Sequence, residues 1–313
     1  MTAKATIGVV GLGNMGAPMA RCLARGGHGL VLYDTRRAAL DPLLGEGPSI
    51  VAAREPAEIG ARCATVITML PDSDAVRDAV LGGTGRAGVV PALAPGGTVI
   101  DMSSSAPMAT LRLGHDLEAH GIGLVDAPVS GGVPRAVDGT LTIMAGGEAE
   151  TVESVAPVLS CMGTVHRTGT LGSGHAMKAL NNYVSAAGLL AVCEALIVAE
   201  RFGLDPRVLN DVLKASTGRN NTTDRKVEQH MLNRTFESGF ALDLMRKDVG
   251  IARALAADLA LDAPWLQGCE DLLDRAARAL GPGADHTAVL AYLEERLATR
   301  SVPPAPESTD HED

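Results

Sequence analysis

The fold of this chain is decided by the stretch Ile7-Gly8-Val9-Val10-Gly11-Leu12-Gly13-Asn14-Met15-Gly16, in which an apolar run leads into a glycine-rich turn. The run predicts a buried β-strand, and the turn opens directly into a helical pattern. Gly11 would allow the tight turn, Gly13 would let the backbone approach a pyrophosphate, and Gly16 would permit close packing of helix on strand. The amides at the start of the helix would face the phosphates. We therefore expect a dinucleotide to be bound by Gly11, Leu12, Gly13, Asn14, Met15 and Gly16.

An acidic residue ends the next predicted strand. Leu30–Tyr33 is followed by Asp34, 18 residues after Gly16, where a carboxylate binds the ribose hydroxyls and would repel a 2′-phosphate. This favours NAD as the cofactor. Arg36 and Arg37 follow, and an arginine here either holds the 2′-phosphate of NADP or is a surface charge, so NADP stays open. We include Asp34, Thr35 and Arg36 among the expected cofactor contacts.

Apolar runs and helical patterns alternate through the first half of the chain. Further strands are predicted at Thr65–Leu70, Thr98–Asp101, Gly123–Asp126 and Leu141–Met144, which indicates βαβ units and a mostly parallel sheet. From about residue 172 only helical periodicity remains, beginning with a long helix from Ser173, a plausible N-cap, to Phe202. The next helix would begin near Pro206 and end near Gly218, and further helices are predicted at 241–258, 264–280 and 286–298.

The predicted fold is an α/β Rossmann-like N-terminal domain followed by an all-α C-terminal domain, joined by a long interdomain helix. The boundaries are 1–171 for the dinucleotide-binding domain and 172–300 for the helical substrate and oligomerisation domain. Residues 301–313, rich in proline and mixed charge, are expected to be disordered.

The composition excludes several classes of function. A net charge of −10 without a basic cluster argues against nucleic acid as a partner. The five cysteines are scattered without CxxC spacing, which predicts reduced thiols and no metal site. The longest apolar stretch, Tyr183–Cys193, is too short to span a bilayer, and the N-terminus lacks the pattern of a signal peptide. We expect a soluble, cytoplasmic protein that does not act on a membrane.

The long helix carries the candidate chemistry. Between Ala176 and Ala199 the only charged residues are Lys178 and Glu194, and a lysine is costly to bury there unless a cleft or partner receives it. Asn182 lies four residues after Lys178 and shares its helix face, and His175 precedes Lys178 by about one turn. Lys178 could exchange a proton with a carbonyl or hydroxyl oxygen while Asn182 orients it. A lysine that extends along the surface to water remains the alternative.

Taken together, these motifs resemble the β-hydroxyacid dehydrogenase family, typified by 3-hydroxyisobutyrate dehydrogenase and tartronate semialdehyde reductase. The resemblance covers about residues 5 to 297 and is specific, because the ordered motifs occur at separations like those of the family. The motifs are Val9–Gly16, Asp101-Met102-Ser103-Ser104, Asp126-Ala127-Pro128-Val129-Ser130-Gly131-Gly132, the segment Gly172–Asn182, and Lys247-Asp248.

The resemblance implies a role for each matching residue. Lys178 matches the catalytic lysine and Asn182 its partner, while Lys247 matches a lysine near both the nicotinamide and the substrate. Ser130, Gly131 and Gly132 match the loop that holds the substrate carboxylate, which is sensible because such a loop offers amides and a hydroxyl to an anion. Cofactor contacts are matched by Met69, Leu70, Pro71 and Ser104. The expected substrate is a small β-hydroxy acid such as 3-hydroxyisobutyrate or tartronate semialdehyde.

Two positions depart from the pattern or have no counterpart in it. Ser104 stands where the family often has threonine, and Ala106 where it often has serine, which could alter one cofactor contact. Arg135, just past the carboxylate loop, would face either water, which we favour, or a second acidic group on a substrate.

Two other functions are compatible with this architecture. An imine reductase would usually replace the lysine at position 178, and a non-catalytic nucleotide-binding reader or sensor could lose it. The retained Lys178, Asn182 and Ser130 argue against both. The apolar C-terminal helices, through which the family assembles, predict a homodimer or homotetramer.

Overall fold

The computed structural model describes residues 4–47, 49–83 and 85–298. Contacts divide the chain into two compact units, one formed by the residues up to Asn182 with Gly250–Ala263, the other by Tyr183–Val249 and the chain from Pro264. This division falls inside two helices, α8 (Ser173–Phe202) and α11 (Leu242–Asp258), whereas the sequence placed the boundary at residue 171. The expected disorder of 301–313 lies outside the described residues.

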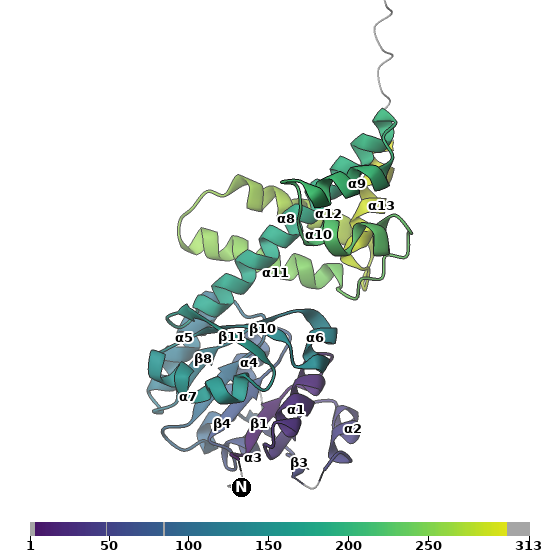
Figure 1. The fold of residues 1–313 in the computed structure, drawn as a ribbon. Helices are drawn as coiled ribbons and strands as arrows, with labels where there is room; N and C mark the ends of the chain where they lie inside the picture. The colour runs from purple at the N-terminus through teal and green to yellow at the C-terminus, as the bar shows by residue number, and fades with distance from the viewer. Residues whose placement is uncertain (1–3, 48, 84, 299–313) are drawn as a thin grey trace, which may run out of the picture. The chain divides into compact units, whose positions relative to one another are not determined.

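The first unit is built on a nine-stranded sheet (Figure 1). Its order is β11-β10-β8-β7-β4-β1-β2-β3, with β9 paired to β10. Neighbouring strands from β3 to β8 are parallel, and β10 meets β8 antiparallel. The strands are β1 (Ile7–Val10), β2 (Leu30–Tyr33), β3 (Ile50–Ala52), β4 (Thr65–Thr68), β7 (Thr98–Asp101), β8 (Gly123–Asp126), β9 (Val129–Ser130), β10 (Leu141–Gly146) and β11 (Gly163–Gly169). A separate two-stranded sheet pairs β5 (Gly82–Gly83) with β6 (Arg86–Ala87).

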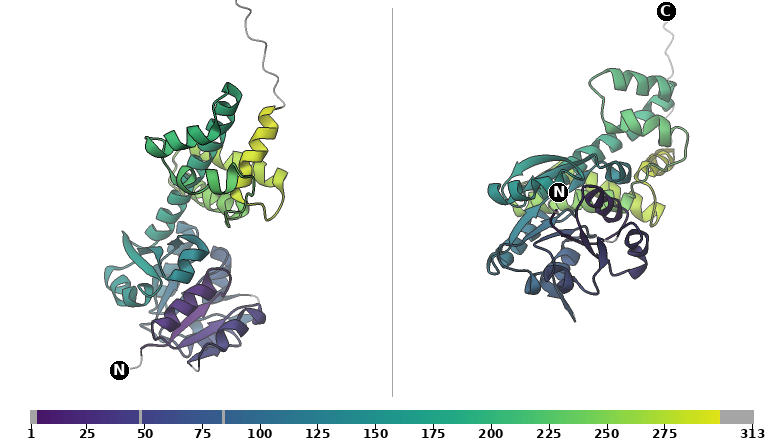
Figure 2. Two further views of the ribbon diagram at one scale, coloured as in Figure 1. Left: turned by 45° about the vertical axis from the view of Figure 1, so that its right-hand side comes forward. Right: turned by 60° about the horizontal axis from the view of Figure 1, so that its bottom comes forward.

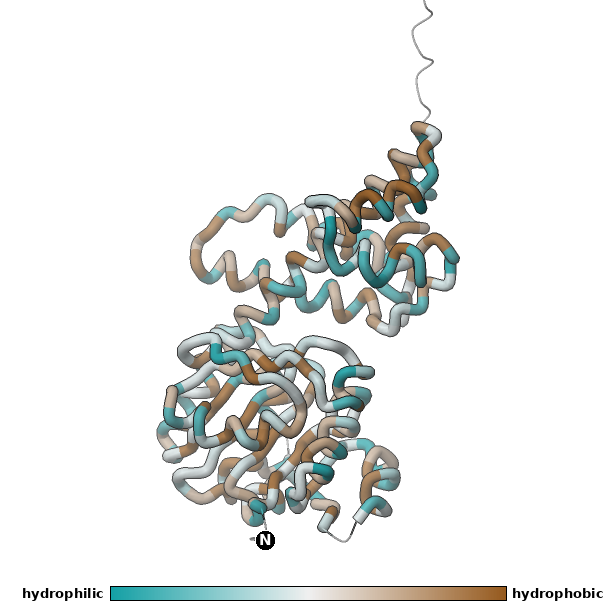
Figure 3. Tube along the Cα trace, in the orientation of Figure 1, coloured by the Kyte–Doolittle hydropathy of each residue, from teal (hydrophilic) through white to brown (hydrophobic). Residues whose placement is uncertain are grey.

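Helices cover both faces of the sheet, as the two further views in Figure 2 show. One apolar core includes Met19 of α1 (Gly16–Arg25), Ala136 of α6 (Gly132–Asp138) and Val155 of α7 (Ala149–Leu159). The other core includes Ile59 of α3 (Pro56–Gly60), Val80 of α4 (Ser73–Leu81) and Leu117 of α5 (Pro107–Glu118). The strands between them are apolar along the tube of Figure 3, as expected when both faces are covered. Three short segments complete the unit: η1 (Arg37–Ala39), α2 (Asp41–Leu44) and η2 (Val90–Ala92).

The second unit is helical in its described residues, as predicted. α12 (Pro264–Leu280) and the start of α9 (Pro206–Ala215) fall at the expected residues, but α9 ends at Ala215 rather than near Gly218. A short helix and a π-helical turn were not predicted: α10 (Asn221–Arg225) and η3 (Val227–Met231). The last predicted helix divides into η4 (His286–Ala288) and α13 (Val289–Ala298).

Two details of the first unit correct the sequence interpretation. The strand expected at Thr65–Leu70 ends at Thr68, so Met69 and Leu70 belong to the following turn. Ser173 is the first residue of α8, and its hydroxyl contacts the Thr168 hydroxyl at 2.7 Å instead of capping the helix. The helix is capped instead by Asp126 at the end of β8, whose carboxylate accepts hydrogen bonds from the amides of Gly172 and His175.

One helix among the described residues, α8, is long and apolar enough to cross a membrane by length and composition alone. The sequence interpretation considered only its shorter apolar core. In the structure 44% of its most apolar window is buried inside the protein. A helix in the core of a protein that is not embedded in a membrane can meet the same criteria, so this observation is weak evidence for a membrane span.

Candidate active site

The glycine-rich turn after β1 has the geometry that a dinucleotide requires. Gly11 has a φ of 98°, and a Cβ there would lie 2.3 Å from the Met69 carbonyl oxygen. A Cβ on Gly16 would lie 2.0 Å from the Gly11 oxygen, so helix α1 could not begin this close to the turn with a larger residue. A Cβ on Gly13, in contrast, would meet only the Arg36 guanidinium at 3.9 Å. Close packing explains why positions 11 and 16 are glycine, while Gly13 leaves room above the turn for a ligand.

Asp34 holds this turn in place. Its side chain is buried, with Oδ2 accepting from the Leu12 amide at 2.8 Å and Oδ1 accepting from the Arg36 amide at 2.8 Å. Arg36 extends into solvent, with 72% of its side chain exposed and its Nε 3.5 Å from Asp34 Oδ1. Thr35 is also exposed. The structure thus adds a task that the sequence interpretation missed, since Asp34 orders the backbone of the turn. Its contact with the ribose of the cofactor stays a prediction.

The other residues that are expected to contact the cofactor follow β4 and β7. Because β1 lies between β2 and β4, the strand order reverses beside β1, and ligands of such sheets bind at the carboxyl ends there. The Met69 amide donates to the Val10 carbonyl at 2.9 Å, and the Leu70 amide donates to the Ser103 hydroxyl at 2.9 Å. Pro71 is exposed and Ser104 half-buried. The expected cofactor residues therefore flank one edge of the sheet.

The candidate carboxylate loop connects β9 to α6. Ser130 pairs with Thr142 of β10, and Gly131 and Gly132 both have positive φ, 131° and 69°. Gly131 and Gly132 are exposed, so the loop can be reached from outside the first unit's core. A Cβ on Gly131 would lie 2.4 Å from Arg135 Cδ, because the Arg135 stem packs over that glycine. Arg135 itself is exposed, in agreement with the interpretation that it faces water.

The candidate catalytic residues stand one and two turns into α8. Lys178 and Asn182 are both half-buried, and the Asn182 side-chain oxygen accepts from the Asn181 amide group at 3.0 Å. They belong to the same compact unit as the glycine turn and the Ser130 loop. Lys247 belongs to the other unit, half-buried, with its Nζ 3.6 Å from Asp248 Oδ1. Its expected place beside the nicotinamide and substrate stays a prediction.

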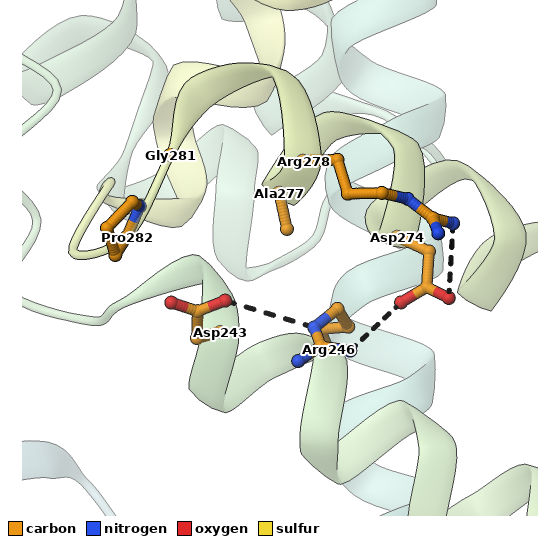
Figure 4. Close-up of a pocket in the computed structure, with 7 residues that line it drawn as sticks. All are labelled: Asp243, Arg246, Asp274, Ala277, Arg278, Gly281 and Pro282. Atoms are coloured by element: carbon orange, nitrogen blue, oxygen red, sulfur yellow. Dashed lines mark hydrogen bonds and ion pairs between the residues drawn. The ribbon is translucent and has the colours of Figure 1, made fainter.

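A surface hollow of the second unit, drawn in Figure 4, contains none of the residues predicted from the sequence. Its charges neutralise one another: Arg246 lies 3.2 Å from Asp274 and 3.9 Å from Asp243, and Arg278 lies 3.7 Å from Asp274. Such exposed ion pairs are common on surfaces and offer no unbalanced charge to a ligand. The candidate site is therefore the carboxyl edge of the sheet in the first unit.

Comparisons with known proteins show the family to which the chain belongs. Residues 6–172 match the family model of the NAD binding domain of 6-phosphogluconate dehydrogenase. Residues 172–293 match a second family model, described as NAD-binding of NADP-dependent 3-hydroxyisobutyrate dehydrogenase. The chain belongs to the β-hydroxyacid dehydrogenase family. It is an NAD(P)-dependent hydroxyacid dehydrogenase, and the glycine turn, with open space at Gly13, fits that cofactor.

Three relatives show how complete the likeness is. 2-(Hydroxymethyl)glutarate dehydrogenase of Eubacterium barkeri is 32% identical over 95% of this chain and 97% of its own. 2-Hydroxy-3-oxopropionate reductase of Escherichia coli is 35% identical over 92% of this chain and 97% of its own. The structure of 3-hydroxyisobutyrate dehydrogenase of Mycobacterium tuberculosis with L-serine matches at a TM-score of 0.84 and 33% identity, covering 92% of this chain and 99% of that one.

Proposed function

We propose that this dehydrogenase interconverts a small β-hydroxy acid and its oxo acid, with Lys178 as the general acid and base. One observation carries the proposal: the end of β8 ties the candidate loop to the candidate helix. Asp126 precedes Ser130 by four residues along the chain. Its carboxylate accepts hydrogen bonds from the start of α8, and Lys178 lies in the next turn of that helix. The candidate anion-binding loop and the helix that carries the candidate proton-exchanging lysine are thus both connected to the end of β8.

The chemistry divides between the cofactor and the chain. The bound nicotinamide supplies the hydride acceptor or donor. In the oxidation, Lys178 Nζ takes the proton of the substrate hydroxyl while hydride leaves the same carbon, and in the reduction Nζ returns that proton to the carbonyl oxygen. Asn182, four residues on along α8, would hold the substrate oxygen or orient the lysine. Ser130, Gly131 and Gly132 would hold the carboxylate through the serine hydroxyl and backbone amides.

The substrates named for the relatives support a common pattern. 2-(Hydroxymethyl)glutarate, 3-hydroxyisobutyrate and L-serine each carry a carboxylate on one carbon and a hydroxymethyl group attached to that carbon. 2-Hydroxy-3-oxopropionate carries the aldehyde of the same arrangement. We infer that the substrate of this enzyme has a carboxylate and a β oxygen, with 3-hydroxyisobutyrate and tartronate semialdehyde as the first candidates.

The test is a substrate panel followed at the nicotinamide absorbance band. The panel contains 3-hydroxyisobutyrate, L-serine, 2-(hydroxymethyl)glutarate and tartronate semialdehyde, with cyclic imines as the comparison. We expect turnover of at least one β-hydroxy acid and none of the imines. Turnover of imines alone would instead favour an imine reductase, and cofactor binding without any turnover would favour a non-catalytic nucleotide sensor.

A further inference from the structure

The first turn of α8 is fixed by a buried cluster of polar side chains. Asp126, at the end of β8, is fully buried and accepts the amides of Gly172 and His175 at 2.8 Å each. The His175 side chain is also fully buried, with its Nδ1 3.7 Å from Asp126 Oδ2. One carboxylate therefore caps the helix from a strand 46 residues earlier and contacts the imidazole that begins the helix.

The same imidazole reaches two further elements. Its Nδ1 lies 2.7 Å from the Thr110 hydroxyl of α5, which itself donates to the Ala106 carbonyl at 3.2 Å, so the nitrogen is best placed as the donor. Its Nε2 has no hydrogen-bond partner among the described residues and faces Asp101 Oδ2, at the end of β7, at 3.6 Å. The helix start is thus hydrogen-bonded to β8 and α5 and lies against Asp101 of β7.

Asp101 is itself held rigidly. Its Oδ1 accepts from the Thr68 hydroxyl at 2.9 Å and from the Ser103 amide at 3.0 Å, and its Oδ2 accepts from the Ser105 hydroxyl at 2.7 Å. Asp101 and Asp126 are direct neighbours in the parallel register of β7 and β8. The two carboxylates therefore form a fixed edge against which His175 is placed.

Backbone packing leaves the helix start little freedom to settle elsewhere. A Cβ on Gly174 would lie 2.2 Å from the Met144 carbonyl oxygen, and one on Gly146 would lie 2.6 Å from the Ser173 hydroxyl. The turn is pressed onto β10 at the same place where Asp126 binds it. Because the α-helix has 3.6 residues per turn, Lys178 stands about one turn beyond His175, and any rotation or slide at the start carries over to it.

We propose that Asp126 is a positioning residue for Lys178, acting with His175 and Thr110 to fix the first turn of α8 in the orientation that catalysis needs. The proposal rests on the proposed function, in which Lys178 exchanges the proton. A misplacement of about 1 Å in a catalytic group can lower a rate by about 100-fold, so a residue that never touches substrate can still control turnover. Both backbone amides donate their hydrogen bonds to this one carboxylate, so Asp126 is the residue to substitute.

The principal variant is Asp126→Asn, which keeps the shape but offers a donor where one backbone amide needs an acceptor. We expect kcat to fall about 10- to 100-fold, with KM for substrate and Kd for cofactor within about threefold of the wild type. The matched control is Val155→Ala on α7, which removes buried methyl groups of the same unit without touching α8. A comparable fall of kcat in that control would show that loss of stability alone explains the effect.

A double-mutant cycle shows whether Asp126 acts through the lysine. We expect Asp126→Asn to lower the rate far less in a Lys178→Ala background than in the wild type, because the group to be positioned is absent. An equal fold-change in both backgrounds, or a raised KM with unchanged kcat, would overturn the proposal. Full activity of Lys178→Ala alone would instead overturn the proposed function, so the two failures are distinguishable.

A milder variant serves if Asp126→Asn does not fold. Thr110→Val removes the hydroxyl partner of His175 Nδ1 at similar volume and leaves Asp126 unchanged. We expect a smaller fall of kcat, about 3- to 10-fold, with KM preserved and with the same loss of effect in the Lys178→Ala background. Wild-type kcat in Thr110→Val, with His175 still buried, would contradict the positioning role of the cluster.

Discussion

The Asp34 carboxylate accepts a hydrogen bond from the Leu12 amide at 2.8 Å, so the end of β2 orders the glycine turn that follows β1. In folds of this kind a carboxylate at this strand end binds the ribose hydroxyls and repels a 2′-phosphate, and we expect the same of Asp34. These two tasks have separable consequences for cofactor binding.

We expect the enzyme to use NAD with higher catalytic efficiency than NADP, because Asp34 is buried at the strand end while Arg36 extends into solvent. The measurement is the ratio of kcat/KM values for the two cofactors. Arg36→Ala is the companion variant and should lower efficiency with NADP more than with NAD. A wild-type preference for NADP would mean that the exposed arginine, and not the aspartate, decides the choice.

Asp34→Ala should weaken both cofactors, since it releases the Leu12 amide from its acceptor. Leaving a buried donor without a partner costs about 1–3 kcal/mol. We expect a lower melting temperature and a higher Kd for NAD and NADP alike, measured by titration of the purified variant. Unchanged stability together with a simple switch toward NADP would show that the carboxylate serves the ribose alone.

Lys178→Ala should retain cofactor affinity and lose most turnover, about 10²- to 10⁴-fold at saturation, the range for a general acid–base group. Lys214→Ala is a suitable control, because that lysine makes surface ion pairs with Asp211 and Glu228 in the second unit. Kinetics at saturating substrate and cofactor decide the matter. Retention of more than about half the wild-type rate in Lys178→Ala would remove the lysine from the mechanism.

The stability of the second unit should depend on the proton affinity of His286. Burial is the main cause that lowers its pKa from 6.5 to about 4. Between these values the unfolded chain binds more protons than the folded one, so the stability contributed by the neutral imidazole is full above 6.5 and is lost as pH falls toward 4. The loss is on the order of 2–3 kcal/mol over that interval.

Urea unfolding at several pH values between about 7 and 4.5 tests this dependence. His286→Gln should flatten the decline of the unfolding free energy on the acidic side, even if it lowers stability throughout. His115→Gln, at a side chain that is 87% exposed, should leave the slope unchanged. The same slope in wild type and His286→Gln would assign the acid sensitivity to other groups.

The glycine turn and most strands could be predicted from the sequence because their signals are local: apolar runs, glycine spacing and a terminal acid. The cap of α8 could not, since Asp126 and the amides it binds are 46 and 49 residues apart, and Ser173 offered a local candidate for the same task. β11 escaped prediction because none of its residues is fully buried at the sheet edge and several are exposed, among them His166 and Arg167. Positions that depend on the relation of distant strands need the structure.

A dimer or tetramer is expected from the apolar side chains exposed on the second unit. Val198 and Phe202 of α8 are 65% and 81% exposed, and Val208 and Val212 of α9 are 59% and 56% exposed. Exposed apolar clusters of this kind mark association surfaces. Light scattering at micromolar concentration should give at least twice the mass of one chain, and Phe202→Glu should reduce it. Arg112→Ala on α5 makes the same change in net charge and should not. A monomeric wild type would contradict the proposal.

The last prediction is that the enzyme requires a carboxylate, or a comparable oxyanion, beside the reacting carbon. Lys178 and Asn182 can serve the hydroxyl or carbonyl oxygen but cannot also hold a second group. Gly131 and Gly132 both have positive φ and are exposed next to the half-buried Ser130, so an anion from solution can reach this loop. In a closed site each amide without an acceptor would cost about 1–3 kcal/mol.

An anion is the natural acceptor for such a loop, and the net charge of −10 opposes it only weakly, because charges beyond about 8 Å are screened at physiological salt. The decisive comparison is a turned-over β-hydroxy acid against its methyl ester, which keeps the reacting carbon and removes the charge. We expect the ester to lose at least about tenfold in kcat/KM, equivalent to about 1.4 kcal/mol of transition-state binding. Ser130→Ala should narrow that gap by weakening the acid alone. Equal efficiency for acid and ester would refute the anion-binding role of the loop while leaving the dehydrogenase activity intact.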